Sequence, residues 1–235
     1  MSFLKLKNIC KTFGNGESEV KALKNINIEI EKGELIAITG KSGCGKSTLL
    51  NVLGGLCSPT SGSYNVEGEE ISSYNQDKLA SFRNRNIGFV VQSFALINDI
   101  NIFDNIALPL KYAGKKSFKI NERVKELTDK LELSDKTSFF PSQLSGGQCQ
   151  RASIARALAC NPRVLLADEP TGALDEQTGK NILNIFKGLN EGGMTVIIVT
   201  HDLEIASMCN RRIEMKDGSI YNDYVLQNAA PSFGE

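Results

Sequence analysis

The stretch Gly40-Lys41-Ser42-Gly43-Cys44-Gly45-Lys46-Ser47 decides the fold of this chain. It matches the phosphate-binding pattern G-x-x-x-x-G-K-[ST] at every fixed position. The apolar run Leu35–Ile38 precedes it, and the helix-like segment Ser47–Leu53 follows it. A strand, a glycine loop and a helix in this order are the setting that the pattern requires. The sequence therefore predicts an α/β fold with a nucleotide-binding core.

The residue types in this loop suit a triphosphate and a divalent cation. Backbone N–H groups and the positive end of a helix bind phosphate, and Gly40, Gly43 and Gly45 let the backbone approach closely. We expect the Lys46 ammonium at the β- and γ-phosphates, and the Ser47 hydroxyl at Mg²⁺, which prefers oxygen ligands. The alternative is a glycine-rich turn without a ligand, but a turn requires neither the Lys-Ser pair nor both flanking elements.

A carboxylate pair ends a second apolar run along the chain. Asp168 and Glu169 follow Val164–Ala167, which reads as a buried strand. Asp168 suits the Mg²⁺ shell, and Glu169 is the candidate general base for the water that attacks the γ-phosphate. Alone, such a pair is often only the polar start of a loop. With a phosphate-binding loop in the same chain, a catalytic role is favoured.

Five further segments occur in the order found in the ATP-binding cassette (ABC) ATPases, which the chain resembles over nearly its whole length. Leu144-Ser145-Gly146-Gly147-Gln148 resembles the family signature. Gln92 lies where the family has its Q-loop, and Ala173-Leu174-Asp175 resembles its D-loop. His201 lies at the switch histidine, and Phe13 at the aromatic residue that stacks on adenine. The resemblance implies a P-loop NTPase core with an antiparallel β subdomain and an inserted α-helical subdomain.

The resemblance also implies roles for individual residues. ATP is expected at Phe13, Gly40, Lys41, Ser42, Gly43, Cys44, Gly45, Lys46, Ser47, Thr48 and Gln92. Catalysis is expected from Lys46, Glu169 and His201. Mg²⁺ is expected at Ser47, Gln92 and Asp168. In the family the signature acts on the ATP of a second subunit, so Leu144, Ser145, Gly146, Gly147 and Gln148 would contact a partner's nucleotide beside the D-loop residue Asp175.

Some of these residues also have simpler interpretations. A lone histidine such as His201 is more often structural, and Gln92 would serve equally as an ordinary loop amide. Ser145 before two glycines reads as a helix N-cap, and Phe13 as a core aromatic. Their positions relative to the predicted strands favour the functional interpretation in each case.

The finer resemblance is to the ATPases of macrolide and antimicrobial-peptide exporters and of lipoprotein-releasing complexes. It is carried by Val20–Lys24, Ile87–Leu110 and Asp168–Asp175. Cys149 departs from the polar residue usual after the signature glutamine, and Phe13 replaces a frequent tyrosine. The branch implies Mg²⁺-dependent ATP hydrolysis that powers a membrane permease exporting or extracting peptide, antibiotic or lipoprotein-like substrates.

The same resemblance sets the expected partners and the alternatives. We expect a head-to-tail homodimer, or a heterodimer with a related cassette, on the cytoplasmic face of the membrane, attached through an integral permease. One alternative is a mechanotransmission ATPase that controls a cell-division partner. Another is a soluble cassette in translation or DNA repair, but those carry tandem cassettes or long coiled-coil insertions.

Length and composition fit this picture. The chain has 235 residues, 41% hydrophobic and 23% charged, which suits one large domain with a substantial core. Lys+Arg and Asp+Glu are both 27, so no basic excess points to nucleic acid. No apolar run approaches the roughly 18–20 residues of a membrane span, and Met1–Asn8 alternates like a strand rather than a signal peptide. The six cysteines lack paired C-x-x-C spacing and read as free thiols.

Hydrophobic periodicity predicts the organisation of the elements. Residues 1–92 and 162–226 are expected to form the α/β core with the β subdomain, and 93–161 the helical subdomain. The apolar residues near the N-terminus alternate like antiparallel strands, and a final hairpin is expected about Lys216-Asp217-Gly218. The tail 227–235 is expected to fray.

Helices are expected at 77–84, 121–133, 146–160, 176–189 and 203–208, with a further helix around Ile106 that Pro109 disturbs near its end. Arg151 and Arg156 are expected to be solvated or ion-paired, without a catalytic role.

Overall fold

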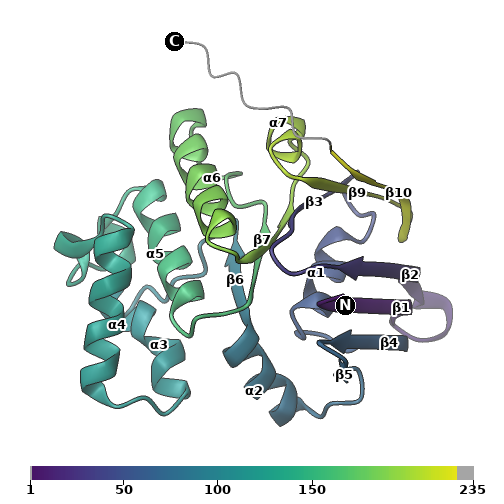
Figure 1. Ribbon diagram of the computed structural model, residues 1–235, viewed down its shortest axis with the longest axis horizontal. Helices are drawn as coiled ribbons and strands as arrows, with labels where there is room; N and C mark the ends of the chain where they lie inside the picture. Colours follow the sequence, from purple (N-terminus) through teal and green to yellow (C-terminus); the bar gives the residue numbers. More distant parts are fainter. Residues whose placement is uncertain (1, 227–235) are drawn as a thin grey trace.

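The computed structural model describes residues 2–226 and contains two sheets (Figure 1). A four-stranded antiparallel sheet has the order β2-β1-β4-β5, and a six-stranded sheet the order β10-β9-β3-β8-β7-β6. The strands of the first sheet are β1 (Leu4–Phe13), β2 (Val20–Ile30), β4 (Ser61–Val66) and β5 (Glu69–Glu70). Those of the second are β3 (Leu35–Gly40), β6 (Ile87–Val91), β7 (Val164–Asp168), β8 (Thr195–Val199), β9 (Arg211–Lys216) and β10 (Ser219–Val225).

The six-stranded sheet carries the predicted parallel core. Strand β8 lies between β3 and β7, β7 pairs with β6, and β9 pairs with β3, all of them parallel. Strand β10 adds the antiparallel hairpin expected about Lys216-Asp217-Gly218. Because the parallel strands point the same way, the loops after β3 and β7 leave the sheet at one edge. The phosphate loop and the carboxylate pair occupy these two loops.

Helices cover the sheets and form a separate cluster on one side (Figure 1). The helices are α1 (Lys46–Leu53), α2 (Gln76–Asn86), α3 (Ile102–Tyr112), α4 (Ser117–Lys130), α5 (Gly146–Leu158), α6 (Glu176–Glu191) and α7 (Leu203–Ser207). Short 3₁₀ turns occur at Gly16–Ser18, Ser134–Lys136 and Pro141–Gln143. Figure 1 shows α3, α4 and α5 grouped opposite the antiparallel sheet. None of the helices within residues 2–226 is both long and apolar enough to cross a bilayer.

Strand β3 supplies side chains to both hydrophobic cores. Leu35 and Ala37 pack with α3, α4, α5 and α6, whereas Ile36 and Ile38 pack with α1 and the antiparallel sheet. This split follows from the strand period of two, which sends successive side chains to opposite faces. Burial on both faces explains why Leu35–Ile38 reads as a continuous apolar run rather than an alternating one.

Two expectations about the helical cluster need correction. The helix expected over 121–133 begins at Ser117, where Ile120 adds a buried side chain, and ends at Lys130 before Glu132 takes a φ of 56°. Pro109 lies inside α3, which continues to Tyr112. Proline lacks the N–H that would donate to the Asn105 carbonyl, but the helix continues beyond it, since the Pro109 carbonyl accepts from the Ala113 N–H at 3.0 Å and from the Asn84 amide at 3.1 Å. The expected fraying of 227–235 lies outside the described residues.

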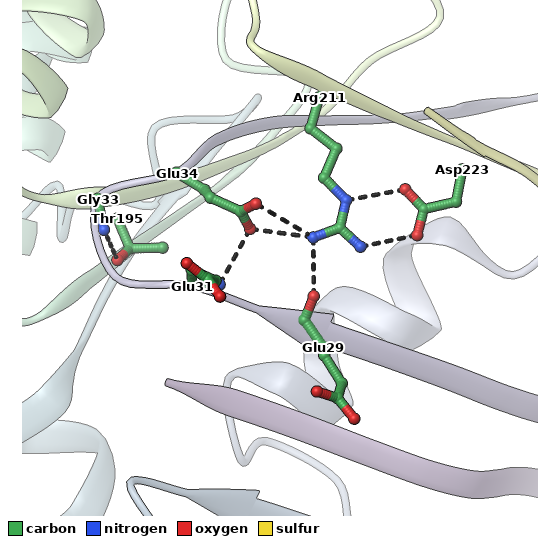
Figure 2. A network of polar contacts seen from close by, with 7 residues as sticks. All are labelled: Glu29, Glu31, Gly33, Glu34, Thr195, Arg211 and Asp223. Atoms are coloured by element: carbon green, nitrogen blue, oxygen red, sulfur yellow. Dashed lines mark hydrogen bonds and ion pairs between the residues drawn. The ribbon is translucent and has the colours of Figure 1, made fainter. Parts of the chain in front are cut away.

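A polar network joins the chain segments at the opposite end of the strands (Figure 2). The Arg211 guanidinium donates to both oxygens of Asp223 at 2.8 and 2.7 Å, to the Glu34 carboxylate at 3.0 Å and to the Glu29 carbonyl at 2.7 Å. Its neighbours hold the pKa of Arg211 above its usual range, with the Asp223 hydrogen bonds as the main cause. The network connects β9 and β10 to the turn between β2 and β3, where Gly33 N donates to the Thr195 hydroxyl.

Candidate functional site

A cavity of about 570 Å³ opens at the edge where β3 and β7 end. This volume is within the ordinary range of small-ligand sites. It is lined by Val20, Lys21, Ala22, Lys24, Ser42, Gly43, Gly45, Lys46, Ser47, Thr48, Asp168, Glu169, Val199, His201, Asp217 and Gly218. The phosphate loop, the carboxylate pair and the predicted switch histidine therefore meet at one cavity.

Two glycines of the phosphate loop are required by close packing. A Cβ on Gly40 would lie 2.3 Å from the Met215 carbonyl oxygen, and one on Gly45 would lie 2.6 Å from that of Ala22. Gly45 also has a φ of 104°, a conformation that side chains disfavour, and it is the N-cap of α1. The loop thus delivers the N-terminus of α1, with its unpaired N–H groups, to the cavity.

Lys46 begins α1 and places its ammonium at the loop. Only 9% of the residue is exposed. Its Nζ donates to the carbonyls of Gly40 at 2.8 Å and Lys41 at 3.0 Å. A buried cation held by loop carbonyls beside a helix N-terminus concentrates positive charge at this point, which suits a phosphate group.

Asp168 and Ser47 form a pair of oxygen donors in the cavity lining. Burial raises the pKa of the Asp168 carboxyl, while its hydrogen bond with the Ser47 hydroxyl acts in the lowering direction. Mg²⁺ is usually held by one or two protein oxygens together with phosphate and water, so this donor set fits it. Residues 2–226 contain no cluster of three or more His, Cys, Asp and Glu side chains for a metal held by protein alone.

Glu169 and His201 are directly paired. The Glu169 Oε1 lies 2.8 Å from His201 Nδ1 and accepts from the His201 backbone N–H at 3.1 Å. The backbone of Glu169 has a φ of 46°, and its N–H donates to the Val199 carbonyl at 2.9 Å. The end of β8 therefore fixes both the backbone and the carboxylate of Glu169. This strained conformation at the cavity is typical of a functional position.

Several predicted site residues do not line this cavity. Phe13 is 45% exposed, with the Lys11 ammonium 5.0 Å from its ring centre, so it is not a core aromatic. Gln92 lies against Gly172, where an added Cβ would meet its amide nitrogen at 2.8 Å. Asp175 caps α6 by accepting from the Thr178 N–H at 2.9 Å.

The signature residues also lie away from the cavity lining. Ser145 is the N-cap of α5, and its hydroxyl accepts from the Gln148 N–H at 3.3 Å. The Gln148 side chain accepts in return from the Ser145 N–H at 2.9 Å. The N-cap interpretation is therefore correct as local structure, and this helix start is separate from the phosphate loop of the same chain.

Some residues that line the cavity were not predicted from the sequence. Lys21 and Ala22 of β2 line it, as do Asp217 and Gly218 of the last hairpin. The Gly218 N–H donates to the Cys44 carbonyl at 3.0 Å, which fastens this hairpin to the phosphate loop. Only the hairpin turn itself was visible in the sequence; its contact with the loop depends on tertiary packing.

The expectation for Arg156 was wrong, whereas that for Arg151 was correct. Arg151 lies 3.8 Å from the Glu132 carboxylate. The Arg156 guanidinium instead donates to the backbone carbonyls of Phe94 at 3.0 Å and Ala95 at 2.5 Å. Both acceptors have positive φ and lie two and three residues after Gln92, so Arg156 holds the loop after β6 on helix α5. Burial lowers the pKa of Arg156.

The parallel sheet, the glycine loop and the carboxylate pair define a P-loop nucleoside triphosphatase. A family model described as ABC transporter matches residues 23–172. The macrolide export ATP-binding/permease protein MacB of Mannheimia succiniciproducens is 47% identical over 223 residues, covering 95% of this chain and 35% of the relative. The MacB of Brucella melitensis is 46% identical over 220 residues, covering 94% and 34%.

A solved structure supports the same assignment. The ATP-binding cassette MJ0796, described as dimeric and bound to ADP and Pi, superposes with a TM-score of 0.88 at 42% identity. The match covers 96% of this chain and 99% of that one. The chain belongs to the ABC transporter family and has its ATPase fold. It spans about a third of the length of the curated relatives that it matches.

Proposed function

We propose that this chain is the ATP-hydrolysing subunit that powers a membrane permease in the export or extraction of peptide, antibiotic or lipoprotein-like substrates. The observation that carries this proposal is the 47% identity with about a third of a protein named for macrolide export, whose name joins ATP-binding and permease parts. Since the identity covers 95% of this chain, it includes the whole nucleotide site. A permease is then the natural partner.

The phosphate loop is proposed to hold ATP through the N-terminus of α1. Its backbone N–H groups and the Lys46 ammonium bind the β- and γ-phosphates, because both present positive charge to the cavity. Ser47 and Asp168 hold Mg²⁺, with Gln92 reaching it when the loop after β6 closes. The bound cation would neutralise charge that develops on the phosphates. Phe13 is proposed to stack on the adenine ring from the exposed end of β1.

Glu169 is proposed as the general base. Its carboxylate is at the cavity, and the 2.8 Å contact with His201 fixes the orientation of its Oε1. Glu169 accepts the proton of the attacking water, while His201 contacts the γ-phosphate and orients that water. Lys46 stabilises charge on the transferred group. Catalysis of this kind depends on position, and two backbone groups, the Val199 carbonyl at the end of β8 and the His201 N–H, hold Glu169 in place.

The second half of each site is proposed to come from another cassette. The signature Leu144–Gln148 contains the N-terminus of α5 and lies outside the cavity of its own chain. Helix N-termini bind phosphate, so this segment suits the γ-phosphate of ATP on a partner. Two chains joined head to tail, with Asp175 at the contact, complete two sites. The similarity to a cassette described as dimeric supports this arrangement.

The coupling to a permease is proposed to pass through the loop that follows β6. Gln92 directly follows β6 and precedes the helical cluster along the chain, and Arg156 binds the carbonyls of Phe94 and Ala95 in the same loop. Movement of α3, α4 and α5 relative to the sheet would therefore displace Gln92. The chain would sit on the cytoplasmic face of the membrane, attached peripherally through the permease.

The test uses a tagged Glu169→Gln chain expressed in the source cells. With ATP, this variant is expected to stay in its dimeric complex and to enrich one integral membrane protein after mild solubilisation, identified by mass spectrometry. Lys46→Ala serves as the matched control, since it removes phosphate binding and should reduce the enrichment. A permease with a large external domain supports the proposal. A cell-division partner supports mechanotransmission instead, and an ATP-dependent association with ribosomes or DNA alone would refute both.

A further inference from the structure

Helix α5 carries a buried amide that contacts the loop after β7. Gln150 is 0% exposed, and its Nε2 donates to the Pro170 carbonyl oxygen at 2.5 Å. Its Oε1 has no hydrogen-bond partner within residues 2–226. The nearby apolar side chains of α5, among them Ala152, Ile154 and Ala155, are buried as well. An amide placed in such surroundings is costly, so its one strong hydrogen bond is the feature that calls for an explanation.

The acceptor of this bond belongs to the loop that carries the proposed base. Pro170 is buried and follows Glu169 directly. The Glu169 N–H donates to the Val199 carbonyl, and its own carbonyl accepts from the Gly172 N–H at 3.1 Å. The first hydrogen bond joins the loop to β8, and the second lies within the loop. Gln150 supplies the tie to helix α5, since proline has a carbonyl but no N–H to anchor it in any other way.

The first turn of α5 packs on the residues that follow this loop. A Cβ on Gly147 would meet Thr178 Cγ2 at 2.5 Å, and one on Gly146 would meet Leu174 Cδ2 at 3.2 Å. The start of α5 is therefore in close contact with the segment that leads from Glu169 into α6. A shift of the helix start would be transmitted to the loop through these contacts and through Gln150.

We propose that Gln150 is a positioning residue for ATP hydrolysis, whose hydrogen bond to Pro170 fixes the Glu169 loop to helix α5. The inference rests on the proposed role of Glu169 as general base. Gln150 does not line the cavity, and its hydrogen bond is to Pro170 rather than to the phosphate loop. Its loss should therefore change the orientation of the Glu169 carboxylate while leaving the binding of ATP intact. A misplacement of about 1 Å in a catalytic group costs up to roughly 100-fold in rate.

The test compares Gln150→Met with Ser153→Ala in the purified chain. Methionine has a similar volume but no donor, so the Pro170 carbonyl loses its partner. Ser153 is the matched control, because it lies one turn along α5, is also 0% exposed, and its hydroxyl has no partner among the described residues. Gln150→Met should lower kcat roughly 10- to 100-fold, with the Kd for ATP within about threefold of the parent. Ser153→Ala should leave kcat within about twofold.

A second readout is independent of turnover. Hydrogen exchange of the nucleotide-free chain, measured by mass spectrometry, should be roughly tenfold faster across Glu169–Leu174 in Gln150→Met, because this loop opens more readily without its tie. Exchange in β1 and β2 should stay unchanged. In the Glu169→Gln background, Gln150→Met should still dimerise with ATP. This result would show that the signature at the start of α5 can still bind the ATP of a partner.

The outcomes separate this inference from the proposed function. If Gln150→Met keeps kcat within twofold while Glu169→Gln is inactive, the positioning role is overturned and the base assignment stands. If Glu169→Gln hydrolyses ATP normally, the base assignment itself fails. If Gln150→Met loses kcat, ATP affinity and thermal stability together, or fails to dimerise in the Glu169→Gln background, Gln150 is structural and the inference is overturned.

Discussion

Replacing Arg211 with methionine should destabilise the fold without affecting the nucleotide site. Methionine keeps much of the aliphatic volume but removes every hydrogen bond that the Arg211 guanidinium donates in Figure 2. The side chain of Arg211 is 13% exposed, and its acidic partners Glu34 and Asp223 are 23% and 31% exposed. Both carboxylates would lose their shared cation.

The partial burial of these side chains sets the magnitude. Removing one partner of a fully buried ion pair costs about 3–5 kcal/mol, whereas an exposed pair contributes about 0–1 kcal/mol. The network lies between these limits, so we expect a loss of about 2–3 kcal/mol in the free energy of unfolding. For a domain of this size, 1 kcal/mol shifts Tm by about 2–4 °C, which gives a decrease of about 4–12 °C.

The measurement is urea unfolding followed by circular dichroism, since the chain has no tryptophan. Arg163→Met is the matched control, because it removes a single ion pair with Glu67 in which both side chains are about half exposed. It should cost less than about 1 kcal/mol. A loss below about 1 kcal/mol for Arg211→Met, or one equal to that of the control, would refute the reasoning.

The strand register predicts that ATP binding survives this change. Arg211 pairs with Ile36 and Met215 pairs with Gly40, so the network lies four residues before the phosphate loop along β3. At about 3.3 Å per residue, this separation is roughly 13 Å. The Kd for ATP of Arg211→Met, measured under conditions where the variant is folded, should stay within about twofold of the parent.

Three further predictions concern the site and the core. His201→Ala should lower ATP turnover strongly, with nucleotide affinity within a few-fold, because Glu169 loses its 2.8 Å contact; parallel loss of folding would support a structural histidine instead. Ser145→Arg in the Glu169→Gln background should bind ATP as a monomer, and light scattering that still detects an ATP-driven dimer would contradict the head-to-tail model. Burial raises the pKa of the Cys209 thiol to about 12, so iodoacetamide at pH 8 should modify it only after unfolding, and rapid labelling of the native chain would contradict its burial.

The sequence predicted the parts of the fold that depend on local pattern. The strand before Gly40, the parallel strand before Asp168 and the last hairpin each have a continuous or alternating apolar run bounded by a turn. The glycine loop has a fixed spacing that few other structures require. These features could be predicted because the residues that specify them are neighbours in the chain.

The parts that were missed depend on residues far apart in the chain. Arg156 binds the carbonyls of Phe94 and Ala95, both of which have positive φ, and nothing in their side chains indicates that conformation. Gly218 joins the cavity wall through a hydrogen bond to Cys44, across most of the chain. Backbone carbonyl acceptors cannot be recognised in a sequence. For this reason Arg156 was wrongly expected to be solvated or ion-paired.

The placement of the signature gives the strongest reason to expect a second copy. Its helix N-terminus is capped internally by Ser145 and Gln148, and Gly147 packs too closely on Thr178 to admit a side chain. None of the signature residues 144–148 lines the cavity that contains Lys46 and Glu169. A single chain thus carries two helix N-termini that suit a phosphate, one after the phosphate loop and one at the signature. Only the first lies at the cavity. If both act on one ATP, the signature of one chain must meet the phosphate loop of a second chain, and ATP would then stabilise the contact by binding both.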